Sequence, residues 1–235
     1  MATSFVIGKG TKVRIAMLPL GSEIEPIPAT LTIGVAAIAK DIIDPATITL
    51  ASALPANFKA PAGSFIQFIA PTTGKSVLVQ LKTDAVAADT TLTVFSIPEA
   101  IAAASTAVYP LKLGGRTNAN LSRSGNRTAV VDFDSDGYSK GLTTSIENGI
   151  SFAGNWLPQD AGFATAEYAL QELRQVYVWL ELPKISDAYT TGRIYEGPAS
   201  LTSIPLEIAA DGVITGNIEA SFEGKPKYTP DTAIA

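Results

Sequence analysis

The sequence has no histidine and no cysteine among its 235 residues. Without histidine, it lacks the side chain whose unperturbed pKa lies nearest neutrality, and with it the commonest general base. Without cysteine, it has no thiolate nucleophile, no disulfide and no zinc site built from Cys and His. These absences argue against an enzyme and against the commonest protein metal centres.

Catalytic motifs are missing as well. The sequence has no Gly-Xaa-Ser-Xaa-Gly, no P-loop and no dinucleotide-binding fingerprint. No pattern pairs two acidic residues as a glycosidase would require. We therefore expect no enzyme, and we assign no catalytic, cofactor-binding or metal-binding residue and no cofactor.

Long apolar runs are also lacking. The stretches Leu31–Ala39 and Ile97–Val108 are too short or too interrupted to span a bilayer. Met1–Gly10 lacks the basic start and apolar run of a signal peptide. We expect a protein made in the cytoplasm, with no membrane partner.

Charged residues are few, 17% of the chain against 46% hydrophobic residues, which favours a folded core over disorder. The net charge of −5 is unevenly placed, because residues 1–131 carry +4 and residues 132–235 carry −9. Such an asymmetry allows copies of one chain to stack head to tail, basic surface on acidic surface. Two independently solvated faces explain it equally well.

Short β-branched and aromatic runs predict strands in the first half of the chain. Lys12–Leu18 is typical of a strand, Leu31–Ile43 could be another, and Pro45 marks a boundary. Turn signals then separate four short runs, which predict a small β module: Thr47–Leu50, Ser64–Ile69, Ser76–Leu81 and Thr91–Phe95. One helical turn is expected over Pro98–Ala104.

The second half predicts more strands and one helix. Lys112–Arg127, with two consecutive glycines, polar residues and four basic ones, predicts an exposed loop. Ala164–Arg174 predicts an amphipathic helix with Asp160 at or just before its N-cap. Strands are expected at Val130–Phe133, Gly149–Trp156, Val176–Leu182, Arg193–Ala199 and Val213–Phe222.

The patterns of the helix and of the strand after it predict which sides are buried. On the helix, Phe163, Tyr168, Leu170 and Leu173 recur near helical spacing and should cover the sheet. Along Val176–Leu182 both alternating sets are apolar or aromatic, with Tyr177 and Trp179 in one of them. We expect one face of this strand in the core and the other in a subunit interface, where Tyr and Trp are enriched.

Two clusters have side chains that could bind ligands. Asp132–Gly137 matches the start of an EF-hand calcium loop, but the twelfth position is Thr143 instead of Glu, and Asp-Gly clusters are common in turns. Nucleic-acid phosphates could bind four basic side chains, Lys112, Arg116, Arg123 and Arg127. Because no aromatic residue is interleaved and no recognition helix follows, an exposed loop is the simpler interpretation. We assign a site to neither cluster.

The order of segments in the second half resembles a known family. The segments are Asp132–Tyr138, Gly149–Trp156, a helix, Val176–Leu180, Gly192–Gly197 and Ile218–Gly224. This order is similar to that of the major tail tube proteins of tailed bacteriophages, over about residues 1–45 and 110–235. The family resemblance implies a β-sandwich or barrel core with one α-helix, formed by residues 1–45 and 111–235. Residues 46–110 then form the inserted small β module, which we expect on the outside of a tube.

The resemblance also implies a function. Six subunits would close into a ring around a channel, and rings would stack head to tail into the tail tube of the virion, after assembly in the host cytoplasm. DNA would pass through the lumen without specific binding, and an acidic lumen would repel its phosphates. Other partners would be the tail proteins: a sheath if the tail is contractile, the tape measure, the terminator and the baseplate.

Two other classes of protein are alternatives. Another phage structural part, such as a decoration or tail completion protein, would form closed oligomers that do not extend. A carbohydrate- or surface-binding β-sandwich would be a monomer or small oligomer with an exposed aromatic site. Oligomer size separates the assembling parts from the binding domain.

Overall fold

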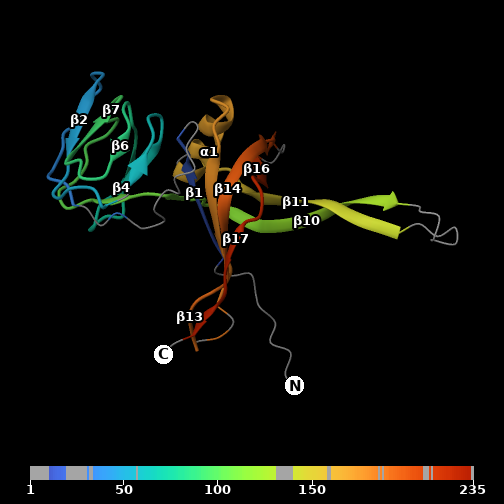
Figure 1. Cartoon of the computed structure of the whole chain (residues 1–235). Helices are drawn as coiled ribbons and strands as arrows, with labels where there is room; N and C mark the ends of the chain where they lie inside the picture. The colour runs from blue at the N-terminus through green and yellow to red at the C-terminus, as the bar shows by residue number, and fades with distance from the viewer. Residues whose placement is uncertain are drawn as a thin grey trace.

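The computed structural model describes residues 11–19, 31, 34–56, 58–130, 140–157, 160–184, 186, 188–208, 212 and 214–233. Within them the protein is mainly β with one α-helix, which confirms the expected fold class. Figure 1 shows three parts: a small β module, a central sheet that carries the helix, and a long β-hairpin that projects from the sheet.

One antiparallel sheet organises the central part. Its strands are β1 (Lys12–Met17), β9 (Leu111–Lys112), β10 (Arg116–Val130), β11 (Lys140–Asn155), β12 (Val176–Glu181), β14 (Ile194–Ser203), β15 (Leu206–Ile208), β16 (Ile214–Phe222) and β17 (Lys227–Thr229). They lie in the order β10-β11-β16-β14-β12-β1-β9, with β15 beside β16 and β17 beside β14. Separately, β13 (Tyr189–Thr191) pairs with β18 (Thr232–Ala233). The strands expected near residues 12, 149, 176, 193 and 213 are thus confirmed.

The helix α1 (Ala161–Gln171) covers one face of the sheet, and Asp160 is its N-cap as expected. The buried side of the helix is made of small residues around Phe163, among them Ala166 and Ala169. The expected apolar face is therefore partly wrong, because Leu173 is 88% exposed. Small residues let the helix backbone lie close to the sheet: a Cβ on Gly162 would stand 2.7 Å from the carbonyl oxygen of Lys112.

The strands β1 and β12 are buried on both faces by this chain itself. Ile15 and Val178 belong to the core under α1. Tyr177 and Trp179, only 1% and 5% exposed, point to the other face and pack into the core of the module. The expectation of a subunit interface at this face is wrong, because the module of the same chain covers the face.

The module has seven strands in the described residues: β2 (Ala46–Thr49), β3 (Lys59–Ala60), β4 (Phe65–Ile69), β5 (Ser76–Gln80), β6 (Ala85–Val86), β7 (Thr91–Val94) and β8 (Thr106–Val108). They pair as β5-β4-β8, β2-β7 and β3-β6. All four strands expected here are present. Alternating residues of β4 and β5, such as Phe68 and Val79, are buried inside the module and belong to the core that it shares with Tyr177 and Trp179.

Two expected elements, a strand in the core residues 1–45 and a helical turn in the module, are replaced by isolated bridges. Neither a strand over residues 31–43 nor a helical turn over 98–104 is found where the structure describes these segments. Instead, Ile38 pairs with Ile101 and Asp41 with Ile97. Residues 34–41 therefore pack with the module, while the division of the chain at residues 46 and 110 stays a prediction.

The largest difference from the expected fold is the hairpin of β10 and β11. The exposed loop predicted over Lys112–Arg127 is wrong, since most of it belongs to β10. Its polar side chains are compatible with a strand because β11 satisfies its backbone on one side and solvent covers much of both faces. In the described part of the chain, no helix is both long and apolar enough to cross a bilayer.

Candidate assembly surfaces

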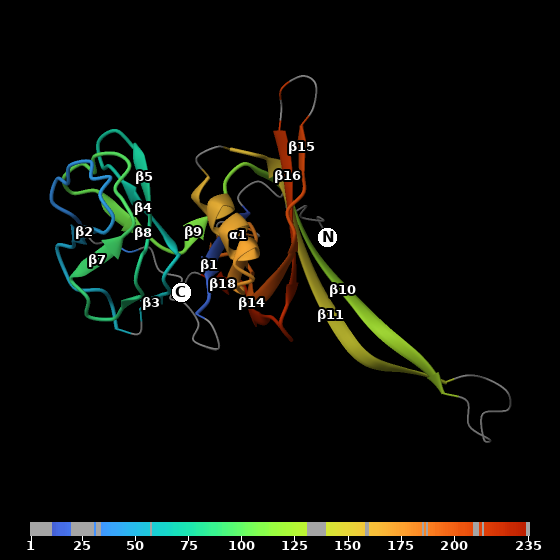
Figure 2. The ribbon, with the colours of Figure 1, turned by 90° about the horizontal axis from the view of Figure 1, so that it is seen from above.

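The long hairpin leaves the central sheet with one open edge. β10 pairs with β11 over its whole length, and among the described residues no strand pairs with its other side. Only Gly149–Asn155 of β11 pairs onward with β16. The rest of the hairpin is a two-stranded ribbon that projects from the body of the protein, as Figure 2 shows. An open edge of this length presents unpaired backbone groups to which another chain can add a strand.

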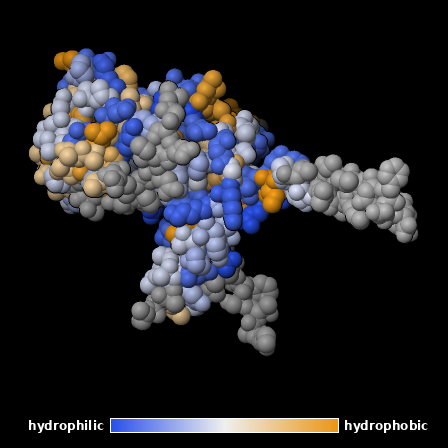
Figure 3. All heavy atoms as spheres, in the orientation of Figure 1, coloured by the Kyte–Doolittle hydropathy of each residue, from blue (hydrophilic) through white to orange (hydrophobic). Residues whose placement is uncertain are grey.

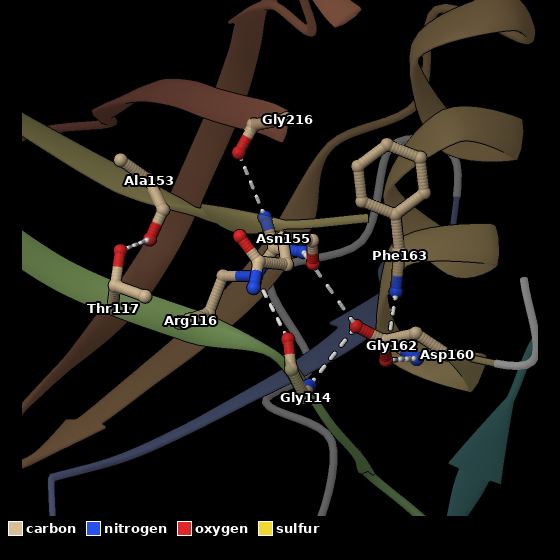
Figure 4. A network of polar contacts seen from close by, with 9 residues as sticks. All are labelled: Gly114, Arg116, Thr117, Ala153, Asn155, Asp160, Gly162, Phe163 and Gly216. Atoms are coloured by element: carbon tan, nitrogen blue, oxygen red, sulfur yellow. Dashed lines mark hydrogen bonds and ion pairs between the residues drawn. The ribbon is translucent and has the colours of Figure 1, made fainter. Parts of the chain in front are cut away.

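The N-cap residue of α1 anchors the start of this hairpin. Asp160 Oδ1 accepts hydrogen bonds from the backbone N–H groups of Gly162 at 3.1 Å and Phe163 at 3.4 Å, and Oδ2 accepts one from Gly114 at 3.0 Å. Figure 4 shows these contacts converging on one carboxylate. Burial raises the pKa of Asp160, and the three hydrogen bonds oppose that rise.

Arg116, the first residue of β10, completes the anchor. It donates hydrogen bonds to the backbone oxygens of Gly114, Asn155 and Gly216 at 2.8, 2.9 and 3.0 Å, and so ties together three segments (Figure 4). Its guanidinium lies 3.9 Å from Asp160 Oδ2, and the two side chains are 6% and 2% exposed. Burial lowers the pKa of Arg116, and Asp160 opposes this. This buried pair joins the start of the hairpin to the N-terminus of α1 and to β16.

A glycine makes the close approach at the hairpin root possible. A Cβ on Gly154 would stand 2.3 Å from the carbonyl oxygen of Gly115, a distance that no side chain tolerates. Farther along the hairpin, a Cβ on Gly125 would meet the methyl group of Thr143 at 3.1 Å. The two strands therefore pack most tightly at the root.

The sheet face away from α1, over β10, β11 and β16, is polar. Ile150 and Phe152 point to the core under α1, so the alternate residues of these strands point to the opposite side. We call this side the polar face; it consists of Asn118, Asn120, Ser122, Ser124, Asn126, Ser145, Glu147, Ser151, Asn217, Glu219 and Ser221. Its charged side chains, as far as the structure describes these strands, are glutamates, and Glu223 follows directly after β16.

Hydrogen bonds hold the three glutamates in place. Asn126 donates to Glu147 at 3.2 Å. Glu219 accepts from Ser203 at 3.2 Å and from Asn217 at 2.9 Å. Glu223 accepts from the hydroxyl group of Ser200. The polar face is therefore acidic and ordered.

On the α1 side of the sheet, a groove lies where the hairpin leaves the body. Its volume is about 560 Å³. We call it the arginine–tyrosine groove; it is lined mainly by Arg123, Ile146, Arg193, Tyr195, Lys225 and Tyr228. The rings of Tyr195 and Tyr228 lie 5.5 Å apart, with Arg123 and Arg193 each 5.7 Å from one of them. Figure 3 shows hydrophobic atoms among hydrophilic ones at the base of the hairpin.

The basic side chains singled out in the sequence do not form one binding site. Arg116 is buried at the hairpin root, Arg123 lies over Tyr195 in the groove, and Lys112 is exposed on β9. The side chain of Arg127 and the segment Asp132–Gly137 lie outside the residues that the structure describes. Sequence reasoning missed the hairpin edge and the groove, although the alternation around Leu121 was a weak signal for the strand.

One family model matches more than half of this chain, and several solved structures are similar to it. The family model described as phage tail tube protein matches residues 100–228. Among solved structures, a chain from the tail of the empty gene transfer agent particle, refined with C6 symmetry, is 20% identical; 50% of this chain and 84% of that chain are covered, with a TM-score of 0.39.

Two further structures are similar at the same level. A chain from the virion of the native gene transfer agent particle is 19% identical, with 50% of this chain and 86% of that chain covered and a TM-score of 0.39. A chain from the baseplate of the anti-feeding prophage is 8% identical, with 73% and 95% covered and a TM-score of 0.40. No curated protein matches the chain.

Proposed function

This chain belongs to the phage tail tube protein family, and from that premise we propose that its copies close into rings that stack into the tail tube through which DNA passes. The protein is a structural component of the phage tail. Rings of six are what the family resemblance implies. Sheath, tape measure, terminator and baseplate proteins would be the neighbours of such a tube.

The observation that best supports ring closure is the open edge of β10. This strand runs from Arg116 to Val130, and its outer side has no partner strand in the described part of the chain. Its polar side chains keep an isolated copy soluble, while the backbone groups can pair with the sheet of a neighbour. In a closed ring every open edge meets the next subunit, so no edge remains.

The polar face is the best candidate for the wall of the channel. Asn and Ser side chains interact weakly with DNA phosphates compared with Lys and Arg, and Glu147, Glu219 and Glu223 repel them. Over Gly149–Asn155 of β11 and over β16, the opposite face cannot take this role, because α1 and its core cover it. The module lies at the other end of the sheet from the hairpin (Figures 1 and 2), which supports the expectation that it sits on the outside.

Shortening the hairpin tests ring closure and stacking. The variant would replace residues 125–146 with a two-residue Asn-Gly turn between Ser124 and Glu147, which pair with each other, so the register of β10 with β11 and the pairing of β11 with β16 are kept. We expect a folded monomer by circular dichroism and no rings or tubes by electron microscopy. Tubes of normal width from this variant would contradict the proposal.

Charge reversal tests the channel wall separately. Tubes in which Glu147, Glu219 and Glu223 are replaced by Lys should retain DNA, and added salt should release it steeply, because each lysine displaces counterions from DNA. Glu172→Lys is the matched control, since Glu172 is exposed at the end of α1. Equal retention by both kinds of tube would show that the polar face does not line the channel.

A further inference from the structure

The strands that carry the polar face have a second open edge, opposite that of β10. After Ser203 the chain passes through Pro205 into β15, which takes over from β14 the pairing with β16. The strands in this region therefore lie in the order β10-β11-β16-β15. In the part of the chain that the structure describes, β15 pairs with β16 alone. Figure 2 shows β15 and the adjoining part of β16 projecting from the body of the protein.

Strand direction distinguishes β15 from the other strands with a free side, β9 and β17. Every pairing in the central sheet is antiparallel, so β9, β16 and β17 run in the same direction as β10, while β15 runs in the opposite direction. Rotation about a channel axis does not reverse a strand. The β15 of a neighbouring copy would therefore meet β10 antiparallel, whereas its β9 or β17 would meet β10 parallel. Antiparallel pairing is the more stable of the two per residue.

The other two strands are also less accessible to a neighbour. β9 has two residues, of which Leu111 is buried, and it contacts both α1 and β4. Tyr228 of β17 lines the arginine–tyrosine groove together with Ile146, so the free side of β17 faces the base of the chain's own hairpin. β15 is therefore the edge that a strand from another copy reaches most easily.

The apolar side chains of β15 match those of β10 on the α1 side of the sheet. All three residues of β15 are exposed, with Leu206 at 44% and Ile208 at 78%. Leu206 lies on the α1 side, because it and Phe163 both face the position of a Cβ on Gly216, and Ile208 points to the same side as Leu206. Leu121 of β10 packs at the edge of the core under α1, also on this side. A sheet that continues from β10 into a neighbour's β15 brings these aliphatic side chains together.

The polar side chains of the two strands match as well. Glu207 lies opposite Thr215, whose side of β16 is the polar face. On the same face, Asn120 and Ser122 of β10 carry groups that can donate hydrogen bonds to a carboxylate. β10 contains three arginines and no acidic residue, whereas Glu207 is the charged residue of β15. Pairing with the faces reversed would place Leu206 and Ile208 on the polar face, which makes it unfavourable.

The geometry of a closed barrel indicates which part of β10 is used. Leu206, Gly216, Gly154 and Arg116 lie in one row across the four strands. Closing a sheet into a barrel requires a stagger between its two edges, so the neighbour's β15 does not meet β10 at Arg116 itself. Because β10 begins at Arg116, the stagger moves the contact toward the tip of the hairpin. Residues 118–124 are the described stretch that follows.

We propose that β15 of one copy pairs antiparallel with the open edge of β10 of the next copy, over residues 118–124. This contact rests on the proposed ring closure and identifies the edge of the neighbour that closes the ring. Leu206 and Ile208 lie beside Leu121 on the α1 side, and Glu207 lies among the Asn and Ser side chains of the polar face. Each copy offers one edge of each kind, so the contact is heterologous and repeats around the ring.

Disulfide trapping tests this contact directly, because the chain has no cysteine of its own. Opposite residues of an antiparallel pair bring their Cβ atoms close enough for a disulfide. Glu207→Cys chains are mixed and oxidised with chains in which one polar-face residue of β10 is replaced by Cys: Asn118, Asn120, Ser122 or Ser124. We expect covalent dimers of one chain of each kind, strongest at one or two of these positions. Arg123→Cys is the matched control, since Arg123 is exposed on the same strand but points to the α1 side, and it should give fewer dimers.

A substitution on β15 gives a second readout. Ile208→Lys should raise the protein concentration needed for tube formation about tenfold, because it places a charge in the apolar part of the contact. Val86→Lys on the module is the matched control, since Val86 is also an exposed aliphatic residue, and it should leave this concentration unchanged.

The two readouts separate this contact from the proposed function. Tubes that form without the expected dimers, and at an unchanged concentration in Ile208→Lys, would overturn the contact and leave the proposed function intact. Dimers without tubes would support the contact and contradict the proposed function. The absence of both dimers and tubes would contradict both.

Discussion

Replacing Asp160 with alanine should destabilise the protein strongly. The carboxylate is 2% exposed, accepts three backbone hydrogen bonds and lies 3.9 Å from the buried guanidinium of Arg116. Removing one partner of a buried ion pair leaves the other uncompensated and costs about 3–5 kcal/mol. Loss of a helix N-cap alone costs about 1 kcal/mol, and the two effects overlap at this residue. We expect the free energy of unfolding to fall by about 4 kcal/mol.

Urea unfolding followed by tryptophan fluorescence measures this loss. Asp160→Asn keeps an N-cap acceptor of the same size but still leaves Arg116 uncompensated, so its loss should be smaller than that of Asp160→Ala by about 1 kcal/mol, the contribution of the cap. Glu99→Ala removes the exposed ion pair with Lys75 and is the matched control, with no measurable change expected. An Asp160→Ala protein within about 1 kcal/mol of the wild type would refute the view that this pair anchors the hairpin.

Three further predictions concern packing and pH. Gly154→Ala should prevent normal pairing at the hairpin root, because its Cβ would stand 2.3 Å from a backbone oxygen. Gly125→Ala should be tolerated, because its Cβ would face only a methyl group. The thermal unfolding temperatures of the two variants test this difference. Trp179→Ala should cost about 3–5 kcal/mol in urea unfolding, and Trp156→Ala, at the half-buried rim of the other core, less than half as much. Burial raises the pKa of Asp160 above its ordinary 3.8, so as the pH falls the folded state binds a proton at this carboxylate before the unfolded state does. Proton binding that favours the folded state increases its stability. The free energy of unfolding of the wild type should therefore rise relative to that of Asp160→Asn as the pH falls from 7 to 4. A difference that shrinks over this pH range would contradict the sign of the shift.

Local sequence patterns were sufficient to predict a strand or helix that has one buried face. β16 alternates apolar and polar residues with period two, and Asp160 marks the start of α1 in the sequence. The buried face of α1 was harder to predict, because Ala166 and Ala169 contribute little hydrophobicity. They are buried for their small size, which only the distance between helix and sheet explains.

The hairpin and the groove could not be predicted from local patterns, for physical reasons. β10 is solvated over much of both faces, so its side chains resemble those of a loop, and its pairing depends on β11 more than on hydrophobic alternation. The groove joins Arg123 to Tyr195 and Tyr228, which are far apart in sequence and meet only through the sheet order. β12 was correctly expected to be buried on both faces, but the surface that covers Tyr177 and Trp179 is the module of the same chain and not a neighbouring subunit.

The most direct measurement of the central claim is electron microscopy of the purified protein over a concentration series. If the open edge of β10 closes rings that stack, hollow tubes with a constant width should appear above a threshold concentration, and their length should grow with concentration. Single rings that never extend would favour a decoration or completion protein. A monodisperse monomer at every concentration would contradict self-assembly into a tube.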